Sequence, residues 1–273
     1  MSPNRRGSGV QPSIGRARPD MTGKVYLIGA GPGDPELMTM KAVRLLQEAD
    51  VVVYDRLVSD EIIAMSPKQA KMIFVGKSAH NHPVPQDEIN AILVREAKAG
   101  NNVARIKGGD PLIFGRGSEE AADLAAEGVE CEYVPGITAA QGAASISGVP
   151  LTHRDLATGV QYVTGHRARD EKLDLDWKRL ADPMTTLVVY MGVANIGQIA
   201  VGLMTEGLDP ATPVFAISRA TTPDERRMVS TLNRVAQDAR DAGLKPPTLF
   251  IIGRVVSLYQ SEQVEPEGIS ANG

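Results

Sequence analysis

The sequence predicts an α/β protein made of two lobes, each with a parallel or mixed sheet, and three observations support this prediction. Short runs rich in valine, isoleucine and leucine alternate with segments whose apolar residues recur every three or four positions. The runs are apolar along their whole length, which is typical of strands covered by helices on both faces of a sheet. The alternation stops at a stretch of small residues, 136–151, and then restarts, so we expect two lobes joined near residues 136–155.

The first half of the chain predicts alternating strands and helices. Apolar runs rich in β-branched residues predict strands at residues 25–28, 51–54, 73–75 and 103–106. Apolar residues at helical spacing predict helices at residues 37–46, 89–97 and 118–127. Gly128 follows the last of these helices, and glycine is common just after the C-terminal end of a helix. We assign residues 24–138 to the N-terminal lobe.

The second half repeats the alternation after the small-residue stretch. Apolar runs predict strands at residues 160–164, 187–190, 214–218 and 249–252. Helical stripes run through residues 196–203 and 232–239. We assign residues 139–260 to the C-terminal lobe. The leader, residues 1–23, is rich in proline, glycine and arginine and is expected to be disordered, and the polar residues 261–273 are expected to form a flexible tail.

Composition and charge exclude several classes of protein. The net charge is −4, but the first 20 residues hold four arginines and one aspartate, so the rest has 25 basic and 32 acidic residues, a net of −7. A body this acidic argues against a nucleic-acid surface, which needs clustered basic residues. No apolar run approaches the ~18 residues of a membrane span, and the N-terminus lacks an apolar signal core. The single cysteine, Cys131, excludes an intramolecular disulfide. We therefore expect a cytoplasmic protein.

The first glycine-rich turn, residues 29–35, follows the first predicted strand and reads Gly-Ala-Gly-Pro-Gly-Asp-Pro. Glycines let a backbone approach a ligand closely, and loops at the carboxyl ends of parallel strands bind ligands in such folds. Asp55 stands about where a dinucleotide-binding fold places its ribose-binding acid. However, Asp34 occupies the third glycine position of the dinucleotide fingerprint, and Pro32 lacks an N–H for phosphate. The turn is therefore a poor dinucleotide site, and it serves either another ligand or the fold alone.

Two further loops share features of this turn. Residues 108–117, after the fourth predicted strand, repeat the Gly-Asp-Pro sequence and place Arg116 between two glycines, where nothing local requires a long cation. Each Gly-Asp-Pro turn presents backbone groups and a carboxylate, which suit a ligand with amine and hydroxyl donors. Residues 135–140 open the small-residue stretch. Their small side chains permit close approach either to a ligand or between helices.

Histidine and serine residues indicate no separate chemistry. His153 and His166 are isolated histidines, and His166 comes just after a predicted strand, a position that is more often structural than catalytic. No spacing of histidine, cysteine and aspartate resembles a metal site, so we expect no metal. Ser147, followed by Gly148, lacks the Gly-x-Ser-x-Gly pattern of hydrolases.

Eight segments taken together resemble the tetrapyrrole methylases. They are residues 25–35, 54–58, 75–77, 108–117, 134–140, 150–154, 164–166 and 190–192. The resemblance runs from about residue 24 to residue 259, in order and at the family's spacing, so it is more specific than any single motif. It implies two α/β lobes with mixed sheets, S-adenosylmethionine in the cleft between them, and a homodimer. Within the family, it implies methylation of uroporphyrinogen III at C2 and then C7, giving precorrin-2 and S-adenosylhomocysteine.

The resemblance also implies roles for particular residues. The positions that contact the cofactor in the family correspond here to Pro32, Gly108, Gly109, Asp110, Ile113, Thr138, Ala139, Met191, Ala220 and Thr248. The positions on the substrate side correspond to Arg56, Lys77, Arg116, Arg154, His166 and Met191. Uroporphyrinogen III carries eight carboxylates, so a local group of cations is expected in spite of the acidic body.

The implied reaction needs a group that helps a proton to leave after methyl transfer. We consider Arg116 either for this role or as the main electrostatic organiser, with Glu119 beside it, and Asp55 as the alternative proton acceptor. Arginine would be an unusual base, because its pKa above ~12 keeps it protonated. Lys77 is a candidate to donate a proton or to bind a substrate carboxylate.

Two alternative functions stay open at this point. A later precorrin C-methyltransferase would use the same cofactor loops, although residues 54–58 and 115–117 favour the first methylation of the series. A non-catalytic tetrapyrrole-binding module is disfavoured, because a degenerate binder would not need every cationic position on the substrate side.

Overall fold

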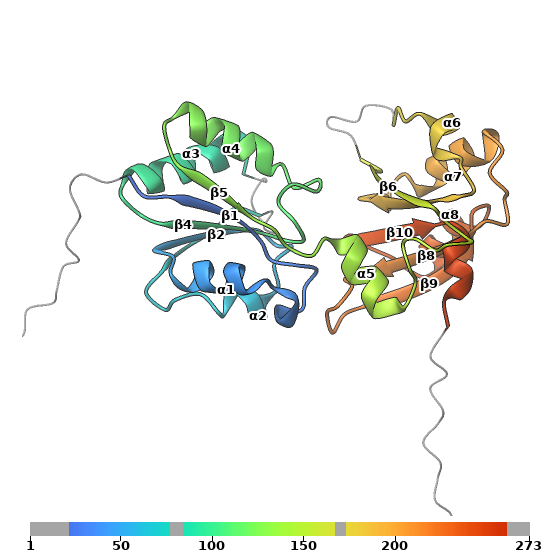
Figure 1. Ribbon diagram of the computed structural model, residues 1–273, viewed down its shortest axis with the longest axis horizontal. Helices are drawn as coiled ribbons and strands as arrows, with labels where there is room; N and C mark the ends of the chain where they lie inside the picture. Colours follow the sequence, from blue (N-terminus) through green and yellow to red (C-terminus); the bar gives the residue numbers. More distant parts are fainter. Residues whose placement is uncertain (1–21, 77–83, 167–172, 261–273) are drawn as a thin grey trace, which may run out of the picture.

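The computed structural model describes residues 22–76, 84–166 and 173–260, which form two lobes side by side (Figure 1). Lys77, the predicted tail and the predicted leader up to residue 21 lie outside the described residues. Each lobe contains one five-stranded sheet with helices on both faces, so the predicted α/β class with two lobes is confirmed. The exact division at residue 138 stays a prediction. Within the described ranges, no helix is long and apolar enough to cross a bilayer.

The first lobe is built on a parallel sheet. Its strands are β1 (Val25–Gly29), β2 (Val51–Tyr54), β3 (Lys71–Phe74), β4 (Val103–Lys107) and β5 (Cys131–Val134). They lie in the order β3-β2-β4-β1-β5, and every pairing is parallel. The inner strands are almost wholly buried, which explains their apolar sequences. Because all five strands run the same way, their carboxyl ends meet at one edge of the sheet.

Helices cover both faces of this sheet. They are α1 (Met40–Gln47), α2 (Asp60–Ile63), α3 (Gln86–Lys98) and α4 (Gly117–Ala126), with a short 3-10 turn at Pro35–Leu37. On one face, Leu46 of α1 and Ile62 of α2 join a core cluster with Ile28. On the other face, Leu93 of α3 and Leu124 of α4 join a second cluster. Figure 1 shows α1 and α2 below the sheet and α3 and α4 above it.

The second lobe has a mixed sheet. Its strands are β6 (Gly159–Thr164), β7 (Thr185–Tyr190), β8 (Pro213–Ser218), β9 (Arg226–Thr231) and β10 (Thr248–Ile252). In the order β6-β7-β10-β8-β9, the pair β6–β7 is parallel and the other pairs are antiparallel. Of the two mixed sheets expected, this one is mixed and the first is parallel throughout.

Helices also lie on both faces of the second sheet. They are α5 (Ala139–Ser147), α6 (Trp177–Leu180), α7 (Ile196–Thr205), α8 (Val235–Asp241) and a 3-10 helix at Arg254–Leu258. Ile199 and Leu203 of α7 and Val235 of α8 belong to one core cluster. Ala140 and Ala143 of α5 belong to the cluster on the opposite face, so α5 packs as part of the second lobe.

Several elements lie where the sequence indicated none. The buried face of α5 consists of alanine, glycine and serine, which give little hydrophobic periodicity. The edge strand β9 begins with Arg226 and Arg227 and is mostly not buried, so it lacks the apolar run of an inner strand. β5, α2 and α6 are each only four residues long. β3 also ends one residue earlier than expected, at Phe74.

Candidate active site

The carboxyl ends of β1, β4 and β5 bring three small-residue loops together. Gly31 and Gly109 exchange two backbone hydrogen bonds, of 3.1 and 2.6 Å. Both have positive φ, +77° and +69°, which glycine adopts readily. Gly136 lies against the same loops, because a Cβ added to it would stand 2.3 Å from the carbonyl oxygen of Gly109. The three loops are therefore packed backbone against backbone, with no room for a side chain at Gly136.

The two aspartates of the Gly-Asp-Pro turns hold these loops in shape. Asp110 accepts hydrogen bonds from the N–H of Leu112 at 2.8 Å and of Gly136 at 3.1 Å. Asp34 accepts from the N–H of Glu36 at 2.8 Å. The carboxylates that were expected to meet ligand donors thus also carry a structural task. Asp110 in particular joins the loop after β4 to the loop after β5.

The first glycine turn reaches the second lobe. The N–H of Asp34 donates to Thr221 Oγ1 at 3.2 Å. Pro32 packs against α5, where a Cβ added to Gly142 would stand 2.5 Å from the Cβ of Pro32. Pro32 and Ala220, the residue before Thr221, therefore lie where the two lobes meet.

Tyr190, at the end of β7, holds the first turn of α5. Its hydroxyl accepts a hydrogen bond from the N–H of Ala140 at 3.2 Å and lies 2.7 Å from Thr138 Oγ1. Its ring is 5.0 Å from that of Phe114 and 5.6 Å from that of Tyr162, centroid to centroid. Burial raises the pKa of Tyr190, so the hydroxyl stays protonated at neutral pH. Tyr190 is not among the residues predicted from the sequence to act in the site, although it lies in one of the family segments.

Backbone strain gathers around the same junction. In the described part of the chain, the non-glycine residues with positive φ are Phe114, Arg116, Met191, Arg219 and Thr221. They lie in the loops that follow β4, β7 and β8. Each such conformation costs of order 1–3 kcal/mol, and residues of this kind cluster at active sites and ligand clamps. The backbone therefore marks the interlobe junction as a functional site independently of any motif.

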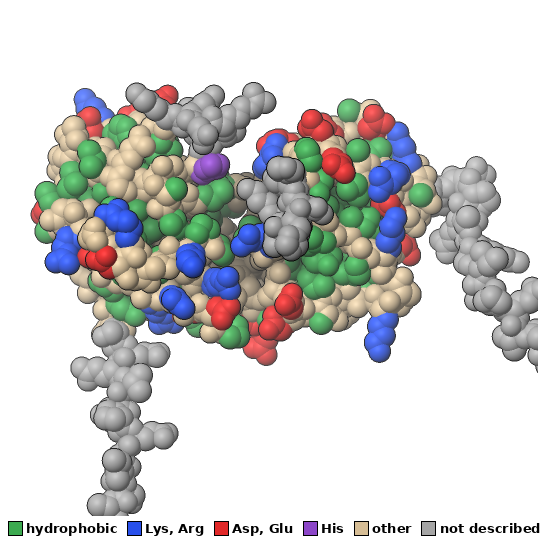
Figure 2. Space-filling view, turned by 180° about the vertical axis from the view of Figure 1, so that it is seen from behind, with side chains coloured by type: hydrophobic (Ala, Val, Ile, Leu, Met, Phe, Trp, Pro, Cys, Tyr) green, Lys and Arg blue, Asp and Glu red, His purple; other side chains and the backbone are tan. Residues whose placement is uncertain are grey.

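The surface is hollowed at this junction. Figure 2 shows the hollow between the two lobes, with lysine and arginine side chains around it. A patch of this sign within a chain of net charge −4 suits a polyanionic ligand. In the described residues, no group of three or more histidine, cysteine, aspartate or glutamate side chains could hold a metal ion.

A family model for tetrapyrrole (corrin/porphyrin) methylases matches residues 24–236. The chain belongs to the tetrapyrrole methylase family. The family expected from the eight sequence segments is therefore confirmed.

Individual members of the family are similar over most of this chain. A uroporphyrinogen-III C-methyltransferase from Paracoccus denitrificans is 57% identical, over 87% of this chain and 83% of that protein. A siroheme synthase from Methylococcus capsulatus is 49% identical over 92% of this chain but 54% of its own length, so the chain spans about half of that relative. A crystal structure of uroporphyrin-III C-methyl transferase from Thermus thermophilus, complexed with S-adenyl homocysteine, has a TM-score of 0.74 and 44% identity, covering 87% of this chain and 100% of that one.

The tetrapyrrole methylase fold brings most of the predicted cofactor residues to the interlobe junction. Ile113, Ala139 and Ala220 pack against one apolar cluster of the second lobe. Gly108 and Gly109 lie in the glycine loop after β4. Thr248 differs, because it is buried in β10 and its hydroxyl donates to a backbone carbonyl at 2.7 Å. The contacts of all these residues with a cofactor stay predictions.

The predicted substrate residues of this methylase are exposed side chains on loops of both lobes. Arg56 follows β2 in the first lobe, and Arg154, His166 and Met191 belong to the second. Within the described ranges no hydrogen bond or ion pair joins these four to one another, and their grouping around a substrate stays a prediction. Lys77 lies outside the described residues.

Arg116 is held in a bidentate ion pair. Its guanidinium donates to both carboxylate oxygens of Glu119, at 2.6 to 3.1 Å. These hydrogen bonds raise the pKa of Arg116 and lower the pKa of Glu119. Arg116 therefore remains a cation and is a poor proton acceptor, whereas its half-exposed side chain can meet an anionic ligand.

Asp55 is a partly open carboxylate in a defined orientation at the carboxyl end of β2. Its Oδ1 accepts a hydrogen bond from the N–H of Leu57 at 2.9 Å. Its Oδ2 lies 3.4 Å from the guanidinium of Arg105, and 23% of its side chain is exposed. Of the two proposed proton acceptors, Asp55 is the carboxylate, and its side chain is partly exposed.

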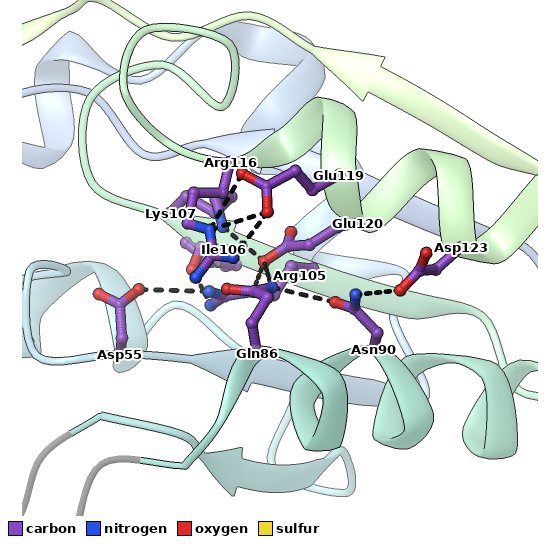
Figure 3. Close-up of polar contacts among 10 residues, drawn as sticks. All are labelled: Asp55, Gln86, Asn90, Arg105, Ile106, Lys107, Arg116, Glu119, Glu120 and Asp123. Carbon is purple, nitrogen blue, oxygen red and sulfur yellow. Dashed lines mark hydrogen bonds and ion pairs between the residues drawn. The ribbon is translucent and has the colours of Figure 1, made fainter. Parts of the chain in front are cut away.

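A buried ionic cluster beside Asp55 was missed by the sequence analysis. Arg105 and Lys107 of β4 meet Glu120 of α4 inside the first lobe, as Figure 3 shows. Burial lowers the pKa of Lys107, and the charge of Arg105 adds to this effect. A signal was available in the sequence, because two cations two positions apart interrupt an otherwise apolar strand.

Proposed function

We propose that this protein transfers methyl groups from S-adenosylmethionine to uroporphyrinogen III, at C2 and then at C7, giving precorrin-2 and S-adenosylhomocysteine. The observation that carries the proposal is the joining of the loops of Gly31, Gly109 and Gly136, where Gly109 faces the start of α5 across an open position. The names of the similar enzymes from Paracoccus and Thermus support the same substrate and cofactor.

The residues at the junction fit an adenosine and a methionine zwitterion. Such a ligand needs backbone donors and acceptors and an apolar slot, but no phosphate cradle. The glycine loops supply the backbone groups, and Ile113 supplies apolar surface. The position that a Cβ of Gly109 would take is open, with the nitrogen of Ala139 3.7 Å away.

When bound, S-adenosylmethionine supplies an electrophilic methyl group on a sulfonium. The residues that would hold it are Pro32, Gly108, Gly109, Asp110, Ile113, Thr138, Ala139, Met191, Ala220 and Thr248. Tyr190 would act through Thr138 and Ala140, because its hydroxyl fixes both residues. Holding two reactants at reacting distance can provide effective molarities of ~10⁵ M or more, so precise loops contribute directly to the rate.

Basic side chains on both lobes would bind the substrate carboxylates. Arg56, Arg116, Arg154 and His166 are exposed, and Lys77 belongs to the same proposed set. A charge-assisted contact between an arginine and a carboxylate contributes about 1.5–3 kcal/mol. Arg116 would give up part of its pairing with Glu119 to contact a substrate carboxylate. Substrate binding would therefore depend on the position of the Arg116 side chain.

Asp55 is the proton acceptor that we propose. Methylation of a pyrrole carbon leaves a proton that must be removed, and Asp55 offers an oriented anionic oxygen at the site edge. The raised pKa of Arg116 favours an organising role for that residue, with Glu119 keeping it in place. Lys77 stays a proposed proton donor or carboxylate ligand.

The proposal extends to the protein's setting. We propose a cytoplasmic homodimer that uses no metal and binds neither nucleic acid nor membrane. The net charge of −7 outside the leader supports the absence of a nucleic-acid partner.

Incubation with uroporphyrinogen III and S-adenosylmethionine tests this function. The expected result is two S-adenosylhomocysteine per tetrapyrrole and the absorbance of oxidised precorrin-2. Arg116→Lys and Asp55→Asn should both slow turnover. Uptake of ligand in a calorimeter without release of S-adenosylhomocysteine would indicate a binding module instead. Turnover of a later precorrin but not of uroporphyrinogen III would indicate another methylase of the series.

A further inference from the structure

The buried cluster of Arg105, Lys107 and Glu120 lies directly behind the carboxyl edge of the first sheet. Arg105 and Lys107 are alternate residues of β4, so their side chains leave the same face of the strand. Glu120 comes from the first half of α4, and its side chain is fully buried. The two cationic side chains are 3% and 7% exposed. Charges as deeply buried as these need a specific reason, because each loses its hydration.

Maximum stability does not explain the arrangement. Oε1 of Glu120 accepts from Lys107 Nζ at 2.7 Å, from Arg105 Nε at 3.3 Å and from Gln86 Nε2 at 3.1 Å. Its other oxygen, Oε2, is buried and has no hydrogen-bond partner in the described part of the chain. An unsatisfied buried polar atom lowers stability, because it loses its hydration and gains no hydrogen bond in return. Buried ion clusters are also often no more stabilising than apolar side chains of the same volume. The cluster therefore serves something besides the core.

Arg105 is the member of the cluster that reaches the proposed active site. Its Nε contacts Glu120, and one terminal nitrogen donates to the carbonyl of Ile106 at 3.1 Å. The other terminal nitrogen lies 3.4 Å from Oδ2 of Asp55. Figure 3 shows Arg105 between Glu120 on one side and Asp55 on the other. A planar guanidinium held at two nitrogens has a fixed direction for the third.

Asp55 is consequently restrained at both of its oxygens. The N–H of Leu57 holds Oδ1 at 2.9 Å, and Arg105 approaches Oδ2. Asp55 directly follows β2, and β2 is the neighbour of β4, with Val53 paired to Arg105. Gln86, which also contacts Asn90 at 3.0 Å, links the cluster to α3. The direction of the Asp55 carboxylate is thus set by contacts that extend through the lobe to two helices.

We propose that Arg105 is a positioning residue for Asp55 and that Glu120 keeps Arg105 in its orientation. This inference rests on the proposed function, in which Asp55 accepts the proton released after methyl transfer. Arg105 does not touch the reacting atoms. It directs the carboxylate oxygen of Asp55 through its guanidinium. Lys107 pairs with the same Glu120 oxygen as Arg105.

Arg105→Lys is the informative variant, because lysine keeps the charge but has no fork that can contact Glu120 and Asp55 together. We expect kcat to fall by about 10- to 100-fold through misplacement of Asp55, with the KM values for both substrates within about twofold of the wild type. In an Asp55→Asn background, the same substitution should change kcat by less than about twofold. An equal fold-loss in both backgrounds would overturn the proposal.

A second measurement does not depend on turnover. In the crystal structure of Arg105→Lys, or in the ¹³C shift of the Asp55 carboxyl group, the carboxylate should leave its wild-type orientation. An unmoved Asp55 would overturn the positioning role even if the wild-type enzyme methylated uroporphyrinogen III. Conversely, absence of S-adenosylhomocysteine from the wild-type reaction would refute the proposed function, while a displaced carboxylate would still support the structural link.

Glu120→Gln and Glu96→Gln complete the design. If Arg105→Lys does not fold, Glu120→Gln is compared in its place in the wild-type and Asp55→Asn backgrounds. This substitution loosens Arg105 without changing the Arg105 side chain. Glu96 is a buried carboxylate of the same lobe, paired with Lys71 and Arg95. Its substitution should lower the free energy of unfolding and leave kcat unchanged. A fall in kcat for Glu96→Gln as large as that for Glu120→Gln would mean that general loosening of the lobe, and not Arg105, controls turnover.

Discussion

Two buried glutamates of the first lobe, Glu96 and Glu120, are each paired with two basic side chains. The two sets of partners differ in exposure and in how they satisfy the carboxylate. Glu96 lies on α3, near the amino end of β3, and Glu120 lies on α4, behind the carboxyl edge of the same sheet. Both oxygens of Glu96 accept from Lys71, at 2.8 and 3.0 Å, and Arg95 adds two further contacts. Only one oxygen of Glu120 has partners among the described residues.

The partners differ as well. Lys71 and Arg95 are 59% and 63% exposed, so they keep most of their hydration while they neutralise Glu96. The cations that meet Glu120 are almost wholly buried. An ion pair that serves stability can recruit flexible surface cations and satisfy every oxygen. The cluster at the site edge instead accepts an unsatisfied atom and directs Arg105 toward Asp55.

The largest expected effect comes from the carboxylate at the site edge itself. Asp55→Asn should reduce kcat by about 10²- to 10⁴-fold, the usual contribution of a general base, with little change in S-adenosylmethionine affinity. Asp50 is a matched control, because it precedes the same strand at the opposite edge and accepts from the N–H of Asn102 at 2.9 Å. Steady-state kinetics and calorimetry provide the measurements. Similar losses from Asp50→Asn would remove the distinction between the two edges.

Glu120→Gln should destabilise the fold more than Glu96→Gln. Removing one partner from a buried pair typically costs about 3–5 kcal/mol, because Arg105 and Lys107 cannot turn to water. For Glu96 we expect about 1 kcal/mol, because its exposed partners regain hydration. Urea unfolding at neutral pH gives both values. Equal costs would show that the burial of the partners is irrelevant.

A smaller effect should appear at the second lobe's side of the junction. Tyr190→Phe removes the hydroxyl that holds Thr138 and Ala140, so S-adenosylmethionine should bind about five- to tenfold more weakly, the equivalent of one hydrogen bond. Tyr162→Phe is the matched control, since Tyr162 contacts Tyr190 through its ring. Calorimetric titration compares them, and equal weakening in both variants would contradict the role of the hydroxyl.

The smallest expected effects are on the pH dependence of the free energy of unfolding, to which Glu96 contributes in acid and Lys107 in alkali. Burial tends to raise the pKa of Glu96, but the hydrogen bonds from Lys71 and Arg95 outweigh it and hold that pKa below its ordinary value of 4.5. As the pH falls below 4.5, the unfolded chain therefore binds more protons at this position than the folded chain. The stabilisation that Glu96 contributes at neutral pH is lost in acid. Burial, and then the charge of Arg105, hold the pKa of Lys107 below 10.5. As the pH rises toward 10.5, Lys107 therefore loses its proton in the folded chain before it does in the unfolded chain. The destabilisation caused by this buried charge decreases over the same range.

Free energies of unfolding across the pH range test these signs. Glu96→Gln should flatten the acid limb relative to the wild type, and Lys107→Met should flatten the alkaline limb. The effect of each substitution should be absent from the other limb. If both substitutions change the same limb, the two clusters do not differ in the way that their burial implies.

Local patterns in the sequence predicted much of the fold and the family. The runs of β1, β2 and β4 and the stripe of α3 stand out because a buried strand is apolar throughout and an amphipathic helix repeats every three or four residues. The helix α5 was not predicted, because alanine and glycine pack well without a strong hydrophobic signal. The site residues came from a family resemblance, and their contacts with ligands remain predictions.

The sequence by itself determined the alternation of strands and helices and the glycine loops at strand ends, because each is written in neighbouring residues. Only the tertiary structure decided that Asp110 holds Gly136, that Tyr190 holds the start of α5, and that Arg105 joins Glu120 to Asp55. These partners are 15 to 50 residues apart in the chain. Such contacts depend on how strands are ordered in a sheet and which helix face covers them, and no local spacing encodes that order.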